Sequence, residues 1–144
     1  MTFKNNAVFI KNFPVRCCHF KKLIKAAHRS SKGHARLCIH PSTRSPVQQM
    51  LLCVTNKARF YYHRHKKSFK SYILLHGEIL FLQEKKNKVL KKRYLFKKNP
   101  IIIHIDPSIW HTYLSLSSYS LLLETKEGPF KKSHVKWKPL DFNL

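Results

Sequence analysis

After an N-terminal stretch of about thirty residues, the chain consists of short β-type runs separated by polar turns. The runs are rich in valine, isoleucine, leucine and aromatic residues, as strands are. We predict nine strands, at Arg36–His40, Val47–Val54, Arg59–His63, Lys70–His76, Glu78–Glu84, Val89–Phe96, Ile101–Ile105, Trp110–Ser117 and Ser120–Thr125. So many short strands at this spacing are typical of a sandwich or barrel and not of a parallel α/β sheet.

One helix is predicted before these strands, at Cys17–Arg29. Its apolar residues recur at intervals of three and four, while lysines occupy the opposite face. With 43% hydrophobic residues, the 144-residue chain has enough apolar material for one compact domain. We therefore expect a mainly β domain preceded by a single amphipathic helix.

The chain is strongly basic, with 29 lysines and arginines against 6 acidic residues and a formal net charge of +23. Such a charge favours polyanionic partners, among them nucleic acid. The lysine doublets, however, lie at strand ends, hairpin tips such as residues 85–88 and the tail, not in one stripe. We interpret most of the charge as compositional, with non-specific nucleic-acid binding as the alternative.

Several classes of protein are excluded or disfavoured. No apolar run approaches the ~18–20 residues of a membrane span, and Lys4 and Lys11 interrupt any signal-peptide core. The cysteines (Cys17, Cys18, Cys38 and Cys53) form no C-x-x-C pair, which favours free buried thiols in a reducing cytoplasm. There is no P-loop, dinucleotide fingerprint or nucleophile elbow.

Three of the ten histidines have an informative arrangement. His63 and His65 are two residues apart in an extended segment, so their side chains face the same side of a sheet. His111 follows a turn at the start of a later strand. Three imidazoles with open positions are a familiar metal site. Alternating histidines on a basic strand also occur as solvent-facing or core residues, and this reading stays open.

The spacing around His63 and His65 resembles the first cupin motif, in which a carboxylate and then a glycine follow the two histidines. Gly77 stands at the glycine position, but Lys70 stands at the position of the acid. Most of the chain resembles the WbuC-type cupin-fold metalloproteins, which are often associated with O-antigen or other surface-polysaccharide loci. The resembling stretches are residues 32–40, 47–51, 62–65, 75–79, 110–112 and 123–130, with Trp137 and Pro139 at the end.

This resemblance implies a single cupin barrel, a double-stranded β-helix or jelly roll, with one N-terminal helix. It divides the chain into an N-terminal extension (1–16), a cupin domain with its leading helix (17–130) and a tail that packs on the barrel (131–144). The metal ligands it implies are His63, His65 and His111. His40, Gln48 and Trp110 are candidates for residues that surround these ligands.

The chain departs from the family pattern at several positions. Lys70 replaces the usual Glu, Cys38 the usual Asn, and Ser108 a glycine whose loss is harmless only if the turn needs no positive φ. Glu124 and Glu127 are expected at a strand end and turn.

Lys70 is the departure with the largest electrostatic effect. A unit charge about 5 Å from a divalent ion, at an effective dielectric constant of about 20, contributes roughly 6–7 kcal/mol, repulsive for Lys and attractive for Glu. Either the three histidines hold the metal alone, or the metal is lost and Lys70 binds an anion.

Two functional hypotheses follow. The first is a WbuC-like cupin that binds a divalent metal (Fe, Zn, Mn or Ni), if it has not lost it, and a small anionic sugar derivative. The second is a degenerate, non-catalytic basic cupin that binds a polyanion such as nucleic acid. Cupins host many reactions and also pure binding proteins, so enzymatic activity is left open, as is homodimer formation.

Overall fold

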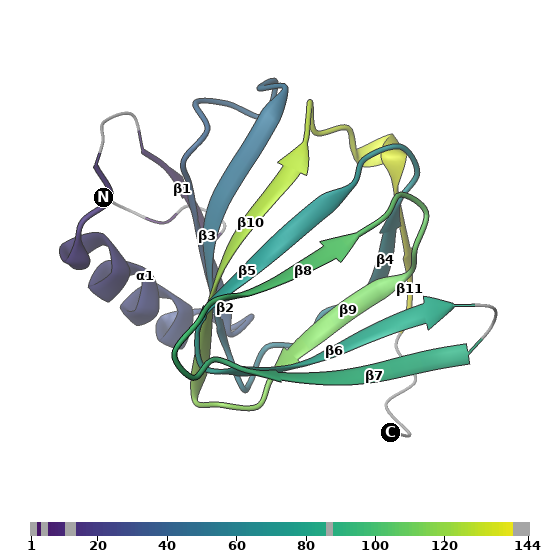
Figure 1. Ribbon diagram of the computed structural model, residues 1–144. Helices are drawn as coiled ribbons and strands as arrows, with labels where there is room; N and C mark the ends of the chain where they lie inside the picture. Colours follow the sequence, from purple (N-terminus) through teal and green to yellow (C-terminus); the bar gives the residue numbers. More distant parts are fainter. Residues whose placement is uncertain (1–2, 4–5, 11–13, 86–87, 140–144) are drawn as a thin grey trace.

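The computed structural model describes the whole chain except residues 1–2, 4–5, 11–13, 86–87 and 140–144. Two β-sheets face each other and one helix packs on the outside (Figure 1). The elements are β1 (Ala7–Phe9), α1 (Cys17–Arg29), β2 (His34–Cys38), β3 (Val47–Thr55), β4 (Tyr62–His65), β5 (Lys70–His76), β6 (Glu78–Lys85), β7 (Lys88–Leu95), β8 (Ile101–Ile105), β9 (His111–Ser115), β10 (Tyr119–Glu127), a short 3₁₀ turn (Lys132–His134) and β11 (Val135–Lys138).

The six-stranded sheet has the order β1-β2-β3-β10-β5-β8, and the five-stranded sheet has the order β11-β4-β9-β6-β7. The described strand pairs are antiparallel, except that β1 runs parallel to β2. Strands distant in sequence are neighbours, for example β3 and β10. This arrangement is the cupin-like sandwich with one N-terminal helix that was expected.

Two hydrophobic clusters stabilise the domain. One fills the space between the sheets, around Leu74, Ile79 and Leu122. The other lies between α1 and the outer face of the six-stranded sheet, where Leu23 and Ala27 are fully buried. Each such leucine contributes roughly 1.5–3 kcal/mol through burial. The helix is thus held by its apolar stripe, as its periodicity predicts.

The helix also determines which side chains of β2 face the interior. Ala35 and Leu37 belong to the cluster under α1. Because side chains alternate along a strand, Arg36 between them faces the opposite side, where it lines a pocket between the sheets. No helix among the described residues could span a membrane.

Several strand boundaries differ from the predictions. The helix and the strands Lys70–His76 and Ile101–Ile105 have the predicted bounds, but β4 covers Tyr62–His65 instead of Arg59–His63. Two short strands, β1 and β11, were not predicted. Both are three or four residues long and pair with a neighbouring strand, so their own composition carries little signal. The predicted tip at 85–88 includes residues 86–87, which lie outside the described part.

The glycine expected after the histidines lies in the connection between β5 and β6. Gly77 adopts a φ of +85°, and a Cβ there would lie 2.6 Å from the carbonyl oxygen of Tyr119, so the tight β5–β6 connection requires glycine.

The expectation of buried thiols is correct for Cys38 and Cys53 but wrong for the adjacent pair 17–18. That pair begins α1, on the part of the helix that faces solvent.

Candidate functional site

The three predicted histidines lie together between the sheets. His63 and His65 are on β4, and His63 is directly opposite His111 of β9 in the strand register. The ring centroid of His63 lies 4.3 Å from that of His111 and 5.5 Å from that of His65. The centroids of His65 and His111 are 6.4 Å apart. The spacing in the sequence therefore identified a real cluster.

Backbone contacts orient two of these rings. The Nδ1 atom of His111 lies 2.9 Å from the carbonyl oxygen of Ile109, and Nδ1 of His63 lies 3.4 Å from that of Tyr61. Each Nδ1–H donates to its carbonyl, which leaves the Nε2 lone pair as an acceptor. Nε2 of His111 is buried and has no hydrogen-bond partner among the described residues.

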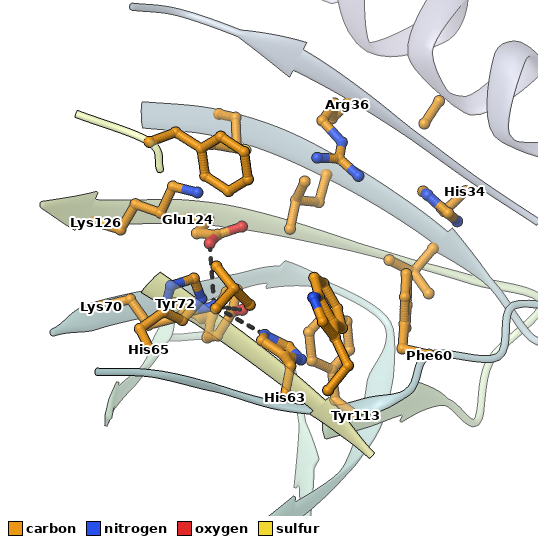
Figure 2. Close-up of a pocket in the computed structure, with 17 residues that line it drawn as sticks. His34, Arg36, Phe60, His63, His65, Lys70, Tyr72, Tyr113, Glu124 and Lys126 are labelled. Carbon is orange, nitrogen blue, oxygen red and sulfur yellow. Dashed lines mark hydrogen bonds and ion pairs between the residues drawn. The ribbon is translucent and has the colours of Figure 1, made fainter. Parts of the chain in front are cut away.

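Lys70 enters this cluster from β5 and is only 3% exposed. Its Nζ lies 3.0 Å from Nε2 of His63, 3.3 Å from the Tyr72 hydroxyl and 3.5 Å from a carboxylate oxygen of Glu124. Figure 2 shows the ammonium between Glu124 and His63. Burial lowers the pKa of Lys70 to about 8, although Glu124 opposes this effect.

Glu124 was expected at a strand end, and this prediction is wrong. It lies within β10, where it is opposite Tyr72 in the register with β5 and is 7% exposed. Burial by itself raises the pKa of the Glu124 carboxyl, but the surrounding cations, Lys70 first, hold it below its usual value. The sequence does contain a signal for this buried position, because Glu124 is an acid that follows an apolar run. Acids are rarely buried without a partner, so such a residue indicates a buried ion pair.

The imidazoles of the cluster are neutral at physiological pH. Burial is the main cause, and the charge of Lys70 adds to it. Together they lower the pKa of His65 to about 3 and hold the pKa values of His63 and His111 well below the usual range. The cluster therefore carries its positive charge on Lys70 and not on a histidine.

The resemblance to cupin-fold metalloproteins implies a metal at this cluster, but the residues present do not fit one. The lone pair of His63 faces the ammonium of Lys70 at 3.0 Å, where a metal would have to bind. Among the described residues, no group of three His, Cys, Asp or Glu side chains is arranged to hold a metal ion. A divalent ion beside the ammonium would also face strong repulsion.

A pocket of about 170 Å³ opens next to the cluster. Three cationic side chains, Arg36, Lys70 and Lys126, line it together with one carboxylate, that of Glu124 (Figure 2). Its wall also contains the aromatic residues Phe60, Tyr72, Tyr113, Phe130 and Trp137. The Nε atom of Arg36 is buried and has no hydrogen-bond partner among the described residues.

Arg36, Lys126 and Trp137 were not identified as site residues from the sequence. Trp137 is on β11, which pairs with β4, and its ring centroid lies 5.3 Å from that of His63. The side chain of Lys126 lies over the ring of Phe130, with Nζ 4.8 Å from the ring centroid. Their positions depend on strand pairing, which the sequence pattern does not reveal.

The three residues expected around the ligands do not line this pocket. His40 lies with Nδ1 2.8 Å from the carbonyl oxygen of Gln49, and Gln48 donates to the carbonyl of Thr43 at 2.8 Å. Trp110 is next to His111 in sequence, but its ring packs against the cations of Arg64 and Lys138. These side chains support the strands and loops around the site.

The turn before His111 does adopt a positive φ. Ser108 has a φ of 68°, and its backbone N–H donates to the carbonyl of His65 at 2.7 Å. This hydrogen bond joins the turn to β4 beside the cluster. The condition under which serine would replace glycine harmlessly is therefore not met.

The comparison with family models identifies one match, over residues 17–96, to a family described as a domain of unknown function, DUF6016. The chain belongs to the DUF6016 family. The matched residues run from α1 to the end of β7, and they include His63, His65 and Lys70. No protein of curated function matches the sequence.

Solved structures show the fold of this DUF6016 protein to be that of cupins. CapF with the inhibitor 3-isopropenyl-tropolone has a TM-score of 0.65 and 8% identity, over 78% of this chain and 33% of that chain. Oxalate oxidase with glycolate has a TM-score of 0.59 and 12% identity, over 76% and 57% of the two chains. KdgF from Halomonas sp. has a TM-score of 0.55 and 15% identity, over 70% of this chain and 84% of that chain.

The chain spans about a third of CapF and 57% of oxalate oxidase. At these identities the similarity shows the fold alone. The chemistry of the site therefore depends on its own residues and not on those of its fold relatives.

Proposed function

We propose that this DUF6016 protein is a WbuC-like cupin that binds a small anionic sugar derivative in the pocket between its sheets. The observation that carries this proposal is the charge of the pocket wall, which has three cationic side chains against one carboxylate. Lys70 is neutralised by Glu124 at 3.5 Å, so Arg36 and Lys126 remain to receive an anion. A guanidinium is well suited to a carboxylate or phosphate, because its fork of donors matches two oxygens.

The size and wall of the pocket support a ligand of monosaccharide size. About 170 Å³ is smaller than the roughly 300–1,000 Å³ of sites for drug-sized ligands. Trp137, Phe60 and Tyr113 offer apolar faces on which a sugar ring can pack.

The fold relatives are compatible with this proposal. A structure of CapF from Staphylococcus aureus, similar to this chain at a TM-score of 0.57, is described as that of a capsular polysaccharide assembling protein. The oxalate oxidase structure contains glycolate, which is a small carboxylate. Together with the resemblance to WbuC-type cupins, they support a role in surface-polysaccharide metabolism.

Calorimetric titration tests the proposal with three probes: galacturonate, galactose 1-phosphate and neutral galactose. We expect galacturonate or the phosphate to bind at least about tenfold more tightly than galactose, because a hydrogen bond to a charged group contributes about 1.5–3 kcal/mol. The two anions distinguish carboxylate from phosphate recognition.

Arg36→Met is the matched variant and Arg44→Met, at an exposed arginine outside the pocket, is its control. Arg36→Met should weaken binding of the anion by about tenfold or more, whereas Arg44→Met should leave it unchanged. Equal binding of galactose and both anions, or equal effects of the two variants, would overturn the proposal.

A further inference from the structure

The ammonium of Lys70 lies among the groups that could otherwise coordinate a cation. Nζ contacts His63 Nε2 at 3.0 Å and Glu124 at 3.5 Å, and the ring of His111 lies against that of His63. We infer that Lys70, paired with Glu124, is a built-in cation that takes the place of a metal ion in this cupin centre. The inference concerns the centre itself and does not depend on which ligand enters the pocket.

The hydrogen-bonding capacity of the ammonium supports this assignment. A lysine ammonium has three donors. The three acceptors around Nζ are the imidazole of His63, the hydroxyl of Tyr72 and the carboxylate of Glu124. The cation is therefore fully coordinated by groups from β4, β5 and β10. It supplies a single positive charge and occupies the acceptors of His63 and Glu124 that a metal would need.

Burial keeps Lys70 in this position. The side chain is 4% exposed and that of Glu124 is 9% exposed. If Lys70 swung away to admit a metal, it would have to leave its carboxylate partner, in a pocket that two other cations, Arg36 and Lys126, also line. Separating a buried ion pair in this way is strongly unfavourable.

Glu124 explains how the charge of the centre can be balanced after the acid at position 70 is replaced. Lys70 and Glu124 lie on neighbouring strands, two positions apart in the register of β5 and β10. The centre thus retains a carboxylate near the imidazoles, supplied by another strand. If the ammonium is removed, Glu124 becomes available as an acid ligand.

Cobalt titration tests the inference, since Co²⁺ bound by imidazole and carboxylate has visible absorption that reports its coordination. The purified wild-type protein should bind no Co²⁺ at this centre and contain no stoichiometric metal by elemental analysis. Lys70→Glu should bind one equivalent. Lys70→Met should bind Co²⁺ at least tenfold more weakly than Lys70→Glu, and Glu124→Gln in the Lys70→Met background should abolish that binding.

Two controls separate this centre from other histidines and from misfolding. His63→Ala combined with Lys70→Glu should lose the Co²⁺ absorption. His104→Ala, at an exposed histidine, should leave the absorption unchanged when it is combined with Lys70→Glu. Circular dichroism establishes that each variant is folded. If Lys70→Glu does not fold, the wild type and Lys70→Met still decide. Wild-type binding of one Co²⁺ that His63→Ala removes would overturn the inference, as would failure of folded Lys70→Met and Lys70→Glu to bind Co²⁺.

Discussion

Lys70 and Glu124 form a buried ion pair, with 3.5 Å between Nζ and Oε1. The pair joins β5 and β10 of the six-stranded sheet and projects toward His63 on the five-stranded sheet. Pairs of this kind cost desolvation energy, and breaking one of them leaves an uncompensated buried charge. Both the stability of the domain and the chemistry of its centre therefore depend on these two side chains.

Glu124→Gln is expected to lower the free energy of unfolding by about 3 kcal/mol, at the lower end of the range for broken buried pairs. The loss stays at this lower end because Lys70, whose pKa is already lowered to about 8, can release its proton when the carboxylate is gone. Urea denaturation at pH 7, followed by circular dichroism, measures the change.

Glu127→Gln is the matched control, because Glu127 is exposed and accepts a hydrogen bond from the backbone N–H of Phe69. It should cost less than about 1.5 kcal/mol. The double variant Lys70→Met and Glu124→Gln should recover part of the loss, since replacing both partners removes the unpaired charge. Equal losses for the two single variants would contradict a buried charged pair.

The histidine cluster could be predicted from the sequence, but its counterion could not. His63 and His65 share a face because side chains alternate along a strand, which is a local rule. Glu124 meets Lys70 through the pairing of two strands about fifty residues apart in sequence, and local patterns do not determine that register. The sequence therefore predicts the histidine cluster, but it does not predict that Glu124 balances the charge of Lys70.

Ser108→Gly is expected to raise the free energy of unfolding by about 0.5–1 kcal/mol. Serine at a φ of 68° pays about 1–2 kcal/mol for the left-handed conformation, and the greater freedom of glycine in the unfolded chain offsets part of that gain. The difference is measured by urea denaturation. Ser118→Gly is the control, because Ser118 is an exposed bend residue without a positive φ. Ser118→Gly should leave the free energy of unfolding unchanged or lower it. A similar increase in both variants would show that the gain in Ser108→Gly does not come from relief of backbone strain.

The interior position of Arg36 illustrates a second limit of sequence reasoning. Its strand, β2, alternates between two buried faces, since Ala35 and Leu37 pack under α1 while Arg36 enters the space between the sheets. Composition places an arginine on the surface by default. Only the position of α1 on the sheet shows which face of β2 is the outer one (Figure 1).

Thiol labelling should divide the four cysteines into two pairs. Cys17 and Cys18 are exposed and should react at once with Ellman's reagent in the native, reduced protein, whereas Cys38 and Cys53 should react only after denaturation. Burial raises the pKa of Cys53 to about 12, so its thiol stays protonated when the pH is raised from about 7 to about 9. The variant Cys17→Ser/Cys18→Ser should show no fast phase. A fast phase in that variant would mean that a buried cluster is open, either the one between the sheets around Cys38 or the one under α1 around Cys53.

Binding of RNA and binding in the pocket should respond differently to salt. Exposed basic residues on the edge strand β7, among them Lys91 and Lys92, can attract RNA non-specifically. The dissociation constant for RNA should rise by about tenfold or more between about 50 and 200 mM salt, because RNA binding releases counterions from several phosphates. Lys91→Glu/Lys92→Glu should weaken RNA binding further and leave galacturonate binding unchanged, as measured by fluorescence anisotropy and calorimetry. If RNA instead binds with little salt dependence and competes with galacturonate, the pocket itself is a nucleic-acid site, and the charge of this chain is functional.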